Sequence, residues 1–394
     1  MFFSRKPASS LILIIDVQSA LVRGTLVNIR SRRHPEIVLT SSVVIPYRPS
    51  GGSAFLMTRA IEAISMISTE ALRYISERAS DPERASEALP RSIDAVHFVL
   101  SSPWIMSQAK TLSLSFQSET DIDAERILGL MADERAKLLS RSTEPLIPVE
   151  EKIFDVKLNG YTVTDWEGVK AKDVSVSFVS SFAGQTTIAR FSEATDRLGL
   201  SADKISFHSS LLLQYIAVRS LMPNRMTYLL MHVHEELTDV VIVDRGACEF
   251  FGSYPTGTRT IARSIAHMAH VSNHAAQSLV EISSVGHAKG AALGSAAMRP
   301  DAVIKTADAW LQECRILCAE GQSNRPFPAN AIISACAHEA FFIDTLSNAY
   351  PNMHIEAMSD DIFEPRVSFG IKADHARMPT LYAIAIHSII EPSN

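Results

Sequence analysis

Five of the thirteen histidines in this chain have a spacing that could hold a metal ion. His232 and His234 stand on a predicted turn, and three more recur after three and four residues, which would place them on one helical face: His267, His270 and His274. Neutral imidazole is a common zinc ligand, so one hypothesis is a metal-dependent hydrolase that uses these five side chains. The alternative, which is far more frequent, is a polar helix face that carries histidines and binds no metal.

A carboxylate accompanies a buried strand at two further places. Asp16 lies near the end of the apolar run at residues 11–17, and Asp239 lies beside a second polar turn. A carboxylate at the end of a strand can hold magnesium through water. It can also cap its turn through its side chain. Both interpretations of Asp16 stay open, and the repetition at Asp239 favours a binding site.

The charge balance argues against nucleic acid as the main partner. With 37 basic and 43 acidic residues, the net charge is -6, which gives no basic field for a phosphate backbone. The apolar run at residues 11–15 ends at Asp16, so we expect no signal peptide and no direct membrane insertion. The four cysteines are too few for a disulfide framework and are expected to be reduced thiols of a cytosolic protein: Cys248, Cys314, Cys318 and Cys336.

Both halves of the chain open with the same order of elements. A strand runs into a polar turn, out along a second strand and on to a third, and a helix follows. The six strands are expected at residues 11–17, 20–27, 37–47, 226–232, 238–244 and 247–254. The 394 residues suffice for two or three domains, so we predict an internally duplicated α/β protein.

Residues 110–183 differ from the segments on either side. Their predicted strands alternate between apolar and polar side chains, whereas the flanking strands are almost continuously apolar. This segment is therefore expected to be a small inserted α+β subdomain. The predicted organisation is a first lobe at residues 1–109, the insert at 110–183, the first lobe again at 184–225, and a second lobe at 226–394 whose C-terminal segment could return to the first lobe.

Duplicated α/β domains that each begin with such a hairpin resemble the actin-like ATPase superfamily. The insert, the sequence ARFSEATDRLGL at residues 189–200 and the sequence LTDVVIVDRG at residues 237–246 are similar to the FtsA/PilM type of that superfamily. The resemblance implies a duplicated actin-like (ribonuclease H-like) two-lobed α/β fold with an inserted small α+β subdomain. It also implies a cleft in which two turns hold the phosphates of ATP and a magnesium ion.

The resemblance implies roles for particular residues. Asp16 would hold the metal, and Asp239 would take the catalytic position. The nucleotide-binding positions would be Asp16, Gln18, Ser19, Arg23, Thr238, Asp239, Ser334 and Ala335.

Several of these positions depart from the pattern of the superfamily. Gln18 stands in place of a glycine in the first turn, and His232, His234 and Glu235 replace an aspartate and two glycines in the second. Residues 331–338 lack the glycine pair of the adenosine-binding turn. Glycine lets backbone N–H groups approach phosphate without a Cβ in the way. We therefore expect weak or lost binding of ATP and Mg²⁺, and at most weak ATPase activity.

The resemblance also implies a cellular role. The chain would be a cytoplasmic scaffold of a membrane-associated assembly, either of the type IV pilus or of the cell-division type. A membrane protein would dock its cytoplasmic segment near the insert, so the chain would lie at the inner face of the membrane through that partner. A basic amphipathic tail like that of FtsA is expected to be absent, and a homo-oligomer stays open.

Overall fold

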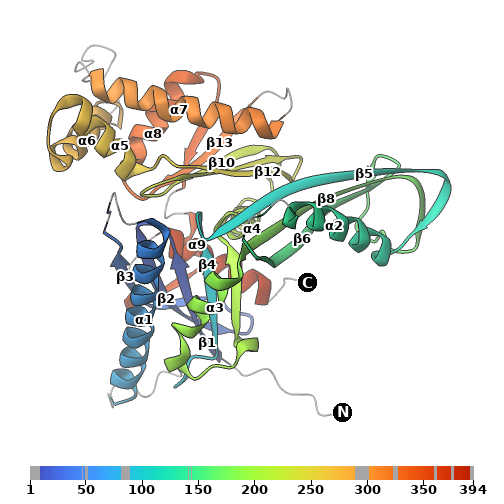
Figure 1. Ribbon diagram of the computed structural model, residues 1–394, viewed down its shortest axis with the longest axis horizontal. Helices are drawn as coiled ribbons and strands as arrows, with labels where there is room; N and C mark the ends of the chain where they lie inside the picture. The colour runs from blue at the N-terminus through green and yellow to red at the C-terminus, as the bar shows by residue number, and fades with distance from the viewer. Residues whose placement is uncertain are drawn as a thin grey trace.

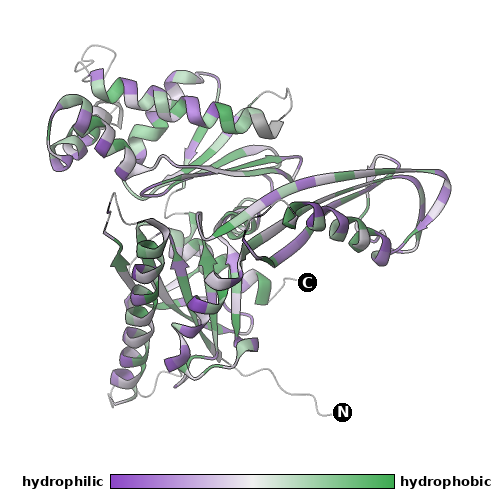
Figure 2. Ribbon diagram, viewed as in Figure 1, coloured by the Kyte–Doolittle hydropathy of each residue, from purple (hydrophilic) through white to green (hydrophobic). Residues whose placement is uncertain are grey.

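A computed structural model describes residues 9–46, 48, 52–80, 89–140, 142, 144–288, 301–322, 327–358, 362–373 and 377–390. Two lobes lie one above the other, and a long insert extends sideways from the region between them (Figure 1). Figure 2 shows hydrophobic strands within both lobes, whereas the insert carries more mixed strands. These three parts contain the elements that position the site.

The first lobe is built on a six-stranded sheet with the order β15-β3-β2-β1-β4-β9. Its strands are β1 (Ser9–Val17), β2 (Leu21–Arg30), β3 (Glu36–Val44), β4 (Ala95–Leu100), β9 (Ile205–Ser209) and β15 (Ser368–Lys372). β1 and β2 form the predicted hairpin, in which Asp16 lies opposite Arg23. β15 pairs with β3, so the chain returns to the first lobe near its C-terminal end.

Strand β1 is buried on both faces, which explains its continuous apolar run. Leu11 and Leu13 share an apolar cluster with helix α1 (Gly52–Ala79), while Ile12 and Ile14 face α4 (Ser210–Leu221) and α9 (Arg377–Ile390). A Cβ on Gly24 of β2 would lie 2.2 Å from Cγ2 of Ile67, so glycine is what allows α1 to approach the sheet. Shorter helical segments complete the lobe: α3 (Gln185–Glu193), η1 (Asp196–Leu198), η2 (Ala202–Lys204) and η4 (Glu364–Arg366).

The second lobe repeats the opening hairpin in a five-stranded sheet with the order β12-β11-β10-β13-β14. Its strands are β10 (Tyr228–Val233), β11 (Thr238–Asp244), β12 (Ala247–Tyr254), β13 (Asn330–Ala335) and β14 (His354–Ala357). Its helices are α5 (Thr258–Ala269), α6 (Asn273–Ala288), α7 (Asp301–Gln322) and α8 (Glu339–Ala349). Cys314 and Cys318 on the inner side of α7 are buried, as small core residues.

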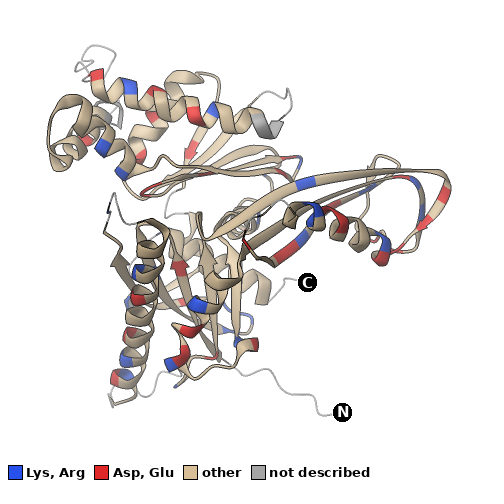
Figure 3. Ribbon diagram, in the orientation of Figure 1, with Lys and Arg blue, Asp and Glu red and all other residues tan. Residues whose placement is uncertain are grey.

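The insert has a sheet of its own with the order β5-β8-β6-β7. Its elements are β5 (Ile105–Ile122), α2 (Ala124–Leu139), β6 (Leu146–Leu158), β7 (Tyr161–Thr162) and β8 (Val169–Gly184). Ile127 and Met131 of α2 pack on one face of this sheet, and acidic and basic residues are interspersed over the rest (Figure 3). The division of the chain at residues 110 and 183 stays a prediction.

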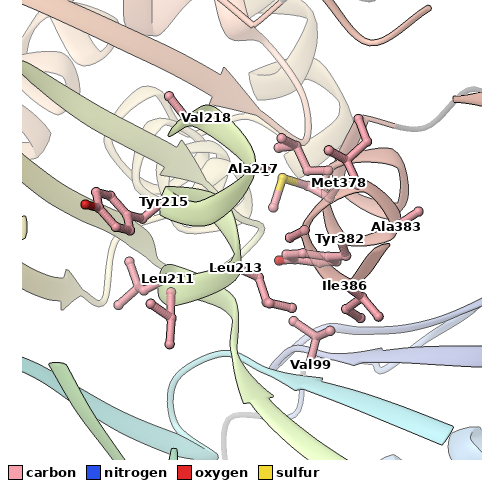
Figure 4. Close-up of a cluster of buried hydrophobic side chains, with 14 of the residues drawn as sticks. Val99, Leu211, Leu213, Tyr215, Ala217, Val218, Met378, Tyr382, Ala383 and Ile386 are labelled. Carbon is pink, nitrogen blue, oxygen red and sulfur yellow. The ribbon is translucent and has the colours of Figure 1, made fainter. Parts of the chain in front are cut away.

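Helices α4 and α9 fill the space between the inner faces of the two main sheets. They share one buried apolar cluster with Ile14 of the first sheet and Val241 of the second. Leu213 of α4 is directed toward Tyr382 of α9 (Figure 4). Helix α9 is formed by the apolar run at the C-terminal end of the chain.

We expect Leu213→Ala to lower the free energy of unfolding by about 2–5 kcal/mol, because it opens a cavity in the cluster that both lobes share. Chemical denaturation followed by tryptophan fluorescence measures this, since Trp104 reports the first lobe and Trp310 the second. Leu128→Ala is the matched control, since Leu128 is 55% exposed. Two separate transitions, with one unaffected by Leu213→Ala, would contradict the shared core.

Candidate functional site

The two hairpin turns meet between the lobes. A cavity of about 340 Å³ is lined from the first lobe by Arg23 and Arg377, and from the second by His232, Ser334 and Glu339. The side chains of Arg377 and Glu339 form an ion pair that joins α9 to the start of α8. The cavity therefore has walls from both halves of the duplication.

In the first turn, Gln18 lies over the carboxylate of Asp16. The Nε2 of Gln18 donates to Oδ2 of Asp16 at 2.8 Å, and Nη1 of Arg23 lies 3.7 Å from the same oxygen. The indole of Trp104 fixes the turn by donating from Nε1 to the carbonyl oxygen of Gln18. Burial raises the pKa of Asp16 to about 6, although Arg23 and His234 oppose the rise.

In the second turn, Asp239 accepts from three side chains. Nε2 of His234 donates to Oδ2 at 2.8 Å, the hydroxyl of Ser253 donates to Oδ1 at 2.6 Å, and the hydroxyl of Ser210 reaches Oδ2 at 3.4 Å. Burial lowers the pKa of His234, but the surrounding carboxylates, with Asp239 first and Asp16 and Glu235 after it, together outweigh burial and the net shift is upward. His234 and Asp239 therefore form a buried pair that favours the charged imidazole.

Thr238 points to the opposite side of the sheet. Its hydroxyl donates to the carbonyl oxygen of Thr256 at 2.6 Å and accepts from Nε1 of Trp310 at 3.0 Å. Neighbouring residues on a strand face opposite ways, so Asp239 faces the cleft and Thr238 faces the helices behind the sheet. The structure does not bring Thr238 to Asp16.

His232 connects the second turn to the third. Its Nδ1 lies 2.6 Å from the hydroxyl of Ser334, and its ring meets that of His234 edge to face at 4.2 Å. Burial lowers the pKa of His232 well below its usual value, and His234 adds to the effect. In the turn after β13, His338 takes the left-handed conformation with φ of +56°, at a place where glycine would be less strained. Ala335 and Cys336 also line the cavity.

Several buried polar atoms at this place have no hydrogen-bond partner among the described residues. They are Oδ1 of Asp16, Oε1 of Gln18, Nδ1 of His234, Oε2 of Glu235 and the hydroxyl of Tyr382. Buried polar atoms are paired as a rule, so these are the atoms open to water or to a ligand. Carboxylate and amide oxygens suit magnesium, and Asp16 with Gln18 fits that ion.

Sequence reasoning missed the residues that reach the site from distant elements. Ser210, Ser253 and Tyr382 come from α4, β12 and α9, and no local pattern marks them. Gly257 could have been singled out from the sequence, because it stands in a Pro-Thr-Gly turn directly before a predicted helix. A Cβ on Gly257 would lie 2.5 Å from the carbonyl oxygen of His234, so glycine allows the start of α5 to pack on the second turn.

The prediction of three histidines on one helical face is wrong. Helix α5 ends at Ala269, His270 has φ of +54°, and His274 belongs to α6. A residue in the left-handed region breaks the helical repeat on which the spacing argument depended. Within the described residues, no three His, Cys, Asp or Glu side chains converge on a metal position. The structure therefore does not support the hypothesis of a metal-dependent hydrolase that uses these histidines.

A larger cavity of about 910 Å³ lies where the insert meets both lobes. Its apolar walls come from β5, β8 and β12 and include Met106, Phe182 and Phe250, while Lys110 and Glu134 form an ion pair at its rim. Met106 is 44% exposed. This groove, which sequence reasoning did not locate, is the second candidate site.

We expect Asp16→Asn to remove a pH-dependent loss of stability. Between about pH 4 and 6 the native state keeps a proton that the unfolded state has released, so the contribution of Asp16 to stability falls as pH rises, by about 3 kcal/mol. Urea unfolding at intervals across this window measures the slope, with Asp133→Asn on exposed α2 as the control. An identical slope in wild type and Asp16→Asn would refute the assignment.

Among the described helices, none has the length and apolar character needed to cross a membrane.

Similarity to known proteins was found by comparing structures. No protein family model matches the chain, and no curated protein matches it. A chain of the PilM-PilN type IV pilus biogenesis complex matches with a TM-score of 0.61 and 13% identity, over 97% of both chains. A Bacteroides thetaiotaomicron protein with an actin-like ATPase fold and unknown function matches with a TM-score of 0.39 and 9% identity, over 98% of this chain and 99% of that one. Apo ParM of psk41 matches with a TM-score of 0.38 and 10% identity, over 97% and 98%.

These findings confirm the fold that the sequence predicted. The match to the pilus protein spans both lobes and the insert. At 13% sequence identity it is evidence for the fold alone. The chain has a duplicated, two-lobed α/β fold with an insert, and its structure is similar to that of the matched chain of the PilM-PilN complex.

Proposed function

We propose that the chain is a cytoplasmic scaffold of a membrane-associated assembly of the type IV pilus type. The observation that carries the proposal is the groove between the insert and the lobes, in a chain whose fold is similar to that of PilM along 97% of its length. The name of that complex includes PilN as the partner of PilM. The pilus type is preferred to the cell-division type because of this similarity.

The groove suits an extended segment of a membrane protein. Phe182, Phe250 and Leu317 offer apolar contact area, and the same lining includes charged side chains such as Lys110 and Glu134. A segment with apolar side chains would bury them against the apolar residues and place its polar groups beside the charged ones. The occupant would be the cytoplasmic segment of a protein anchored in the inner membrane, and it would hold the chain at that membrane.

We expect Met106→Glu to weaken this docking at least about tenfold, because it places a charge in the apolar wall. Fluorescence anisotropy of labelled peptides measures it, with peptides that cover the cytoplasmic segments of the membrane proteins encoded beside this chain. Met66→Glu is the matched control, since Met66 is 60% exposed on α1. Equal weakening by both substitutions, or unchanged binding with Met106→Glu, would refute the groove as the docking site.

We also propose that the turns bind ATP weakly. The backbone N–H groups of Gln18, His234 and Cys336 are already bonded within the chain, to the carbonyl oxygens of Leu21, Leu237 and Val233. The carboxylate of Glu235 is half-buried at the second turn, with Oε2 out of contact with solvent, and would repel a triphosphate. Asp16 would hold the magnesium ion that accompanies the nucleotide, and Arg23 would face its phosphates.

Hydrolysis would be slow or absent for a separate reason. A catalytic aspartate needs a free oxygen with which to orient or deprotonate the attacking water. Both oxygens of Asp239 accept hydrogen bonds, from Ser253 and from His234. His234 and Ser253 would have to move before Asp239 could act as a base.

We expect glycine at positions 18, 234 and 235 together to tighten the binding of MgATP by about 10- to 100-fold, because each recovered charge-assisted hydrogen bond is worth about 1.5–3 kcal/mol and part of this is lost with the broken network. Asp16→Ala should abolish the binding that remains. Isothermal titration calorimetry with and without Mg²⁺ measures both, after circular dichroism has shown that the variants fold. Tight, Mg²⁺-dependent binding or ordinary ATPase turnover by the unmodified protein would contradict the proposal.

A further inference from the structure

A row of cationic side chains follows one end of the first-lobe sheet. Arg32 and Arg33 lie in the exposed turn between β2 and β3. Arg366 stands just before β15 and Arg91 just before β4, and both are exposed. Because β3 lies beside β15, and β1 lies between β2 and β4, these residues share one end of the sheet. With strands about 4.8 Å apart, the row is roughly 20 Å long.

This end of the sheet lies opposite the cleft. β1 begins here, where Ser9 pairs with Arg30, and ends at the cleft near Asp16. In Figure 1 it is the lower end of the first lobe, on the side away from the second lobe. Nine residues of strand separate the two ends, about 30 Å. The cationic row and the candidate nucleotide site are therefore separate places.

The acidic residues at this end either lie beside a basic side chain or accept hydrogen bonds within the chain. Glu36 pairs with Arg30 through Nη2 and Oε2 at 3.0 Å, so neither is counted in the row. Asp94 is partly buried and accepts from the backbone N–H of Leu11 at 2.8 Å. Asp203 is exposed beside Lys204 at the start of β9, and the two cancel. Asp94 keeps one negative charge, so the described residues at this end carry an excess of three positive charges, in a chain whose net charge is -6.

The β2–β3 turn contains an arginine with an unfavourable backbone conformation. Arg32 has φ of +60°, a conformation that glycine or asparagine adopts at lower cost. Arg33 follows it directly, and its N–H donates to the carbonyl oxygen of Arg30 to close the turn. The turn therefore holds two exposed arginines side by side at this end of the sheet.

We propose that this cationic edge binds the surface of a membrane that contains anionic lipids. Anionic headgroups attract exposed arginines, and fluid lipids can gather under cations that are spread over about 20 Å. A protein partner would instead need carboxylates at matched positions. Each arginine near such a surface raises the binding constant about fivefold, so an excess of three charges gives about a hundredfold, which assists a second anchor and does not replace one.

Sedimentation of the full-length protein with lipid vesicles tests the proposal. The probes are vesicles of phosphatidylcholine alone and vesicles with about one third phosphatidylglycerol. We expect binding to the anionic vesicles at low ionic strength, its loss at high ionic strength, and no binding to the neutral vesicles. Arg32→Glu with Arg33→Glu should weaken the binding at least about 25-fold.

The matched control is Arg245→Glu with Lys305→Glu in the second lobe. Arg245 also occupies a turn with positive φ, and both residues are exposed. The control should bind anionic vesicles as the wild type does. If Arg32→Glu with Arg33→Glu lowers the unfolding temperature, Arg91→Glu with Arg366→Glu provides the same charge change on separate segments and is expected to weaken binding to a similar degree.

Three outcomes would overturn the proposal. They are equal binding to neutral and anionic vesicles, equal weakening by the edge and control variants, and binding to soluble polyglutamate without binding to vesicles. The vesicles hold no protein, so the result does not depend on the docking groove. Failure of peptide docking would leave this test intact, and the reverse also holds.

Discussion

The apolar cluster around α4 and α9 is the constraint on which the rest of the structure depends. It fills the space between two sheets that would otherwise present apolar faces to each other across water. Burying a leucine or a tyrosine of this kind stabilises the fold by about 1.5–3 kcal/mol, and the cluster holds many of them. The lobes are therefore joined by a common core, which fixes the distance between the two hairpin turns.

The polar site is a continuation of the inner faces of that core. Asp16 follows Ile12 and Ile14 at intervals of two residues, and Asp239 precedes Val241 on the same face. The same alternation turns Thr238 toward the opposite cluster. The ionisable groups are thus buried because the strands that carry them are buried. Their desolvation explains why the pKa of Asp16 rises to about 6 and why His232 stays neutral.

The hairpins could be predicted from the sequence, because their pattern of apolar and polar residues lies within one short segment of the chain. Continuous apolar runs ended by polar turns identified both hairpins, and with them Asp16 and Asp239. The distant partners of Asp239 could not be predicted, because Ser210 and Ser253 arrive through tertiary packing and have no fixed spacing from the turns.

The role of Thr238 in nucleotide binding stays a prediction, although the alternation along β11 turns Thr238 and Asp239 to opposite faces of the sheet. One prediction from the sequence is wrong for a physical reason. The histidine face failed because a single left-handed residue, His270, ends α5 between the second and third members of the set. The groove could not be predicted, because its walls come from β5, β8 and β12, whose meeting depends on how the insert leans on both lobes.

The proposed membrane edge and the proposed docking groove constrain each other. Strand β4 begins next to Arg91 at the cationic edge and ends at Leu100, close in sequence to Trp104 in the wall of the groove. The groove is therefore about one strand length, 20–30 Å, from the edge. A chain that leaves the bilayer beneath the edge and enters the groove has to span this distance, which takes about 6–9 extended residues. A juxtamembrane segment shorter than this could not reach the groove while the cationic edge rests on the lipid. The two contacts together would then select membrane proteins by the length of their cytoplasmic segment as well as by its apolar residues.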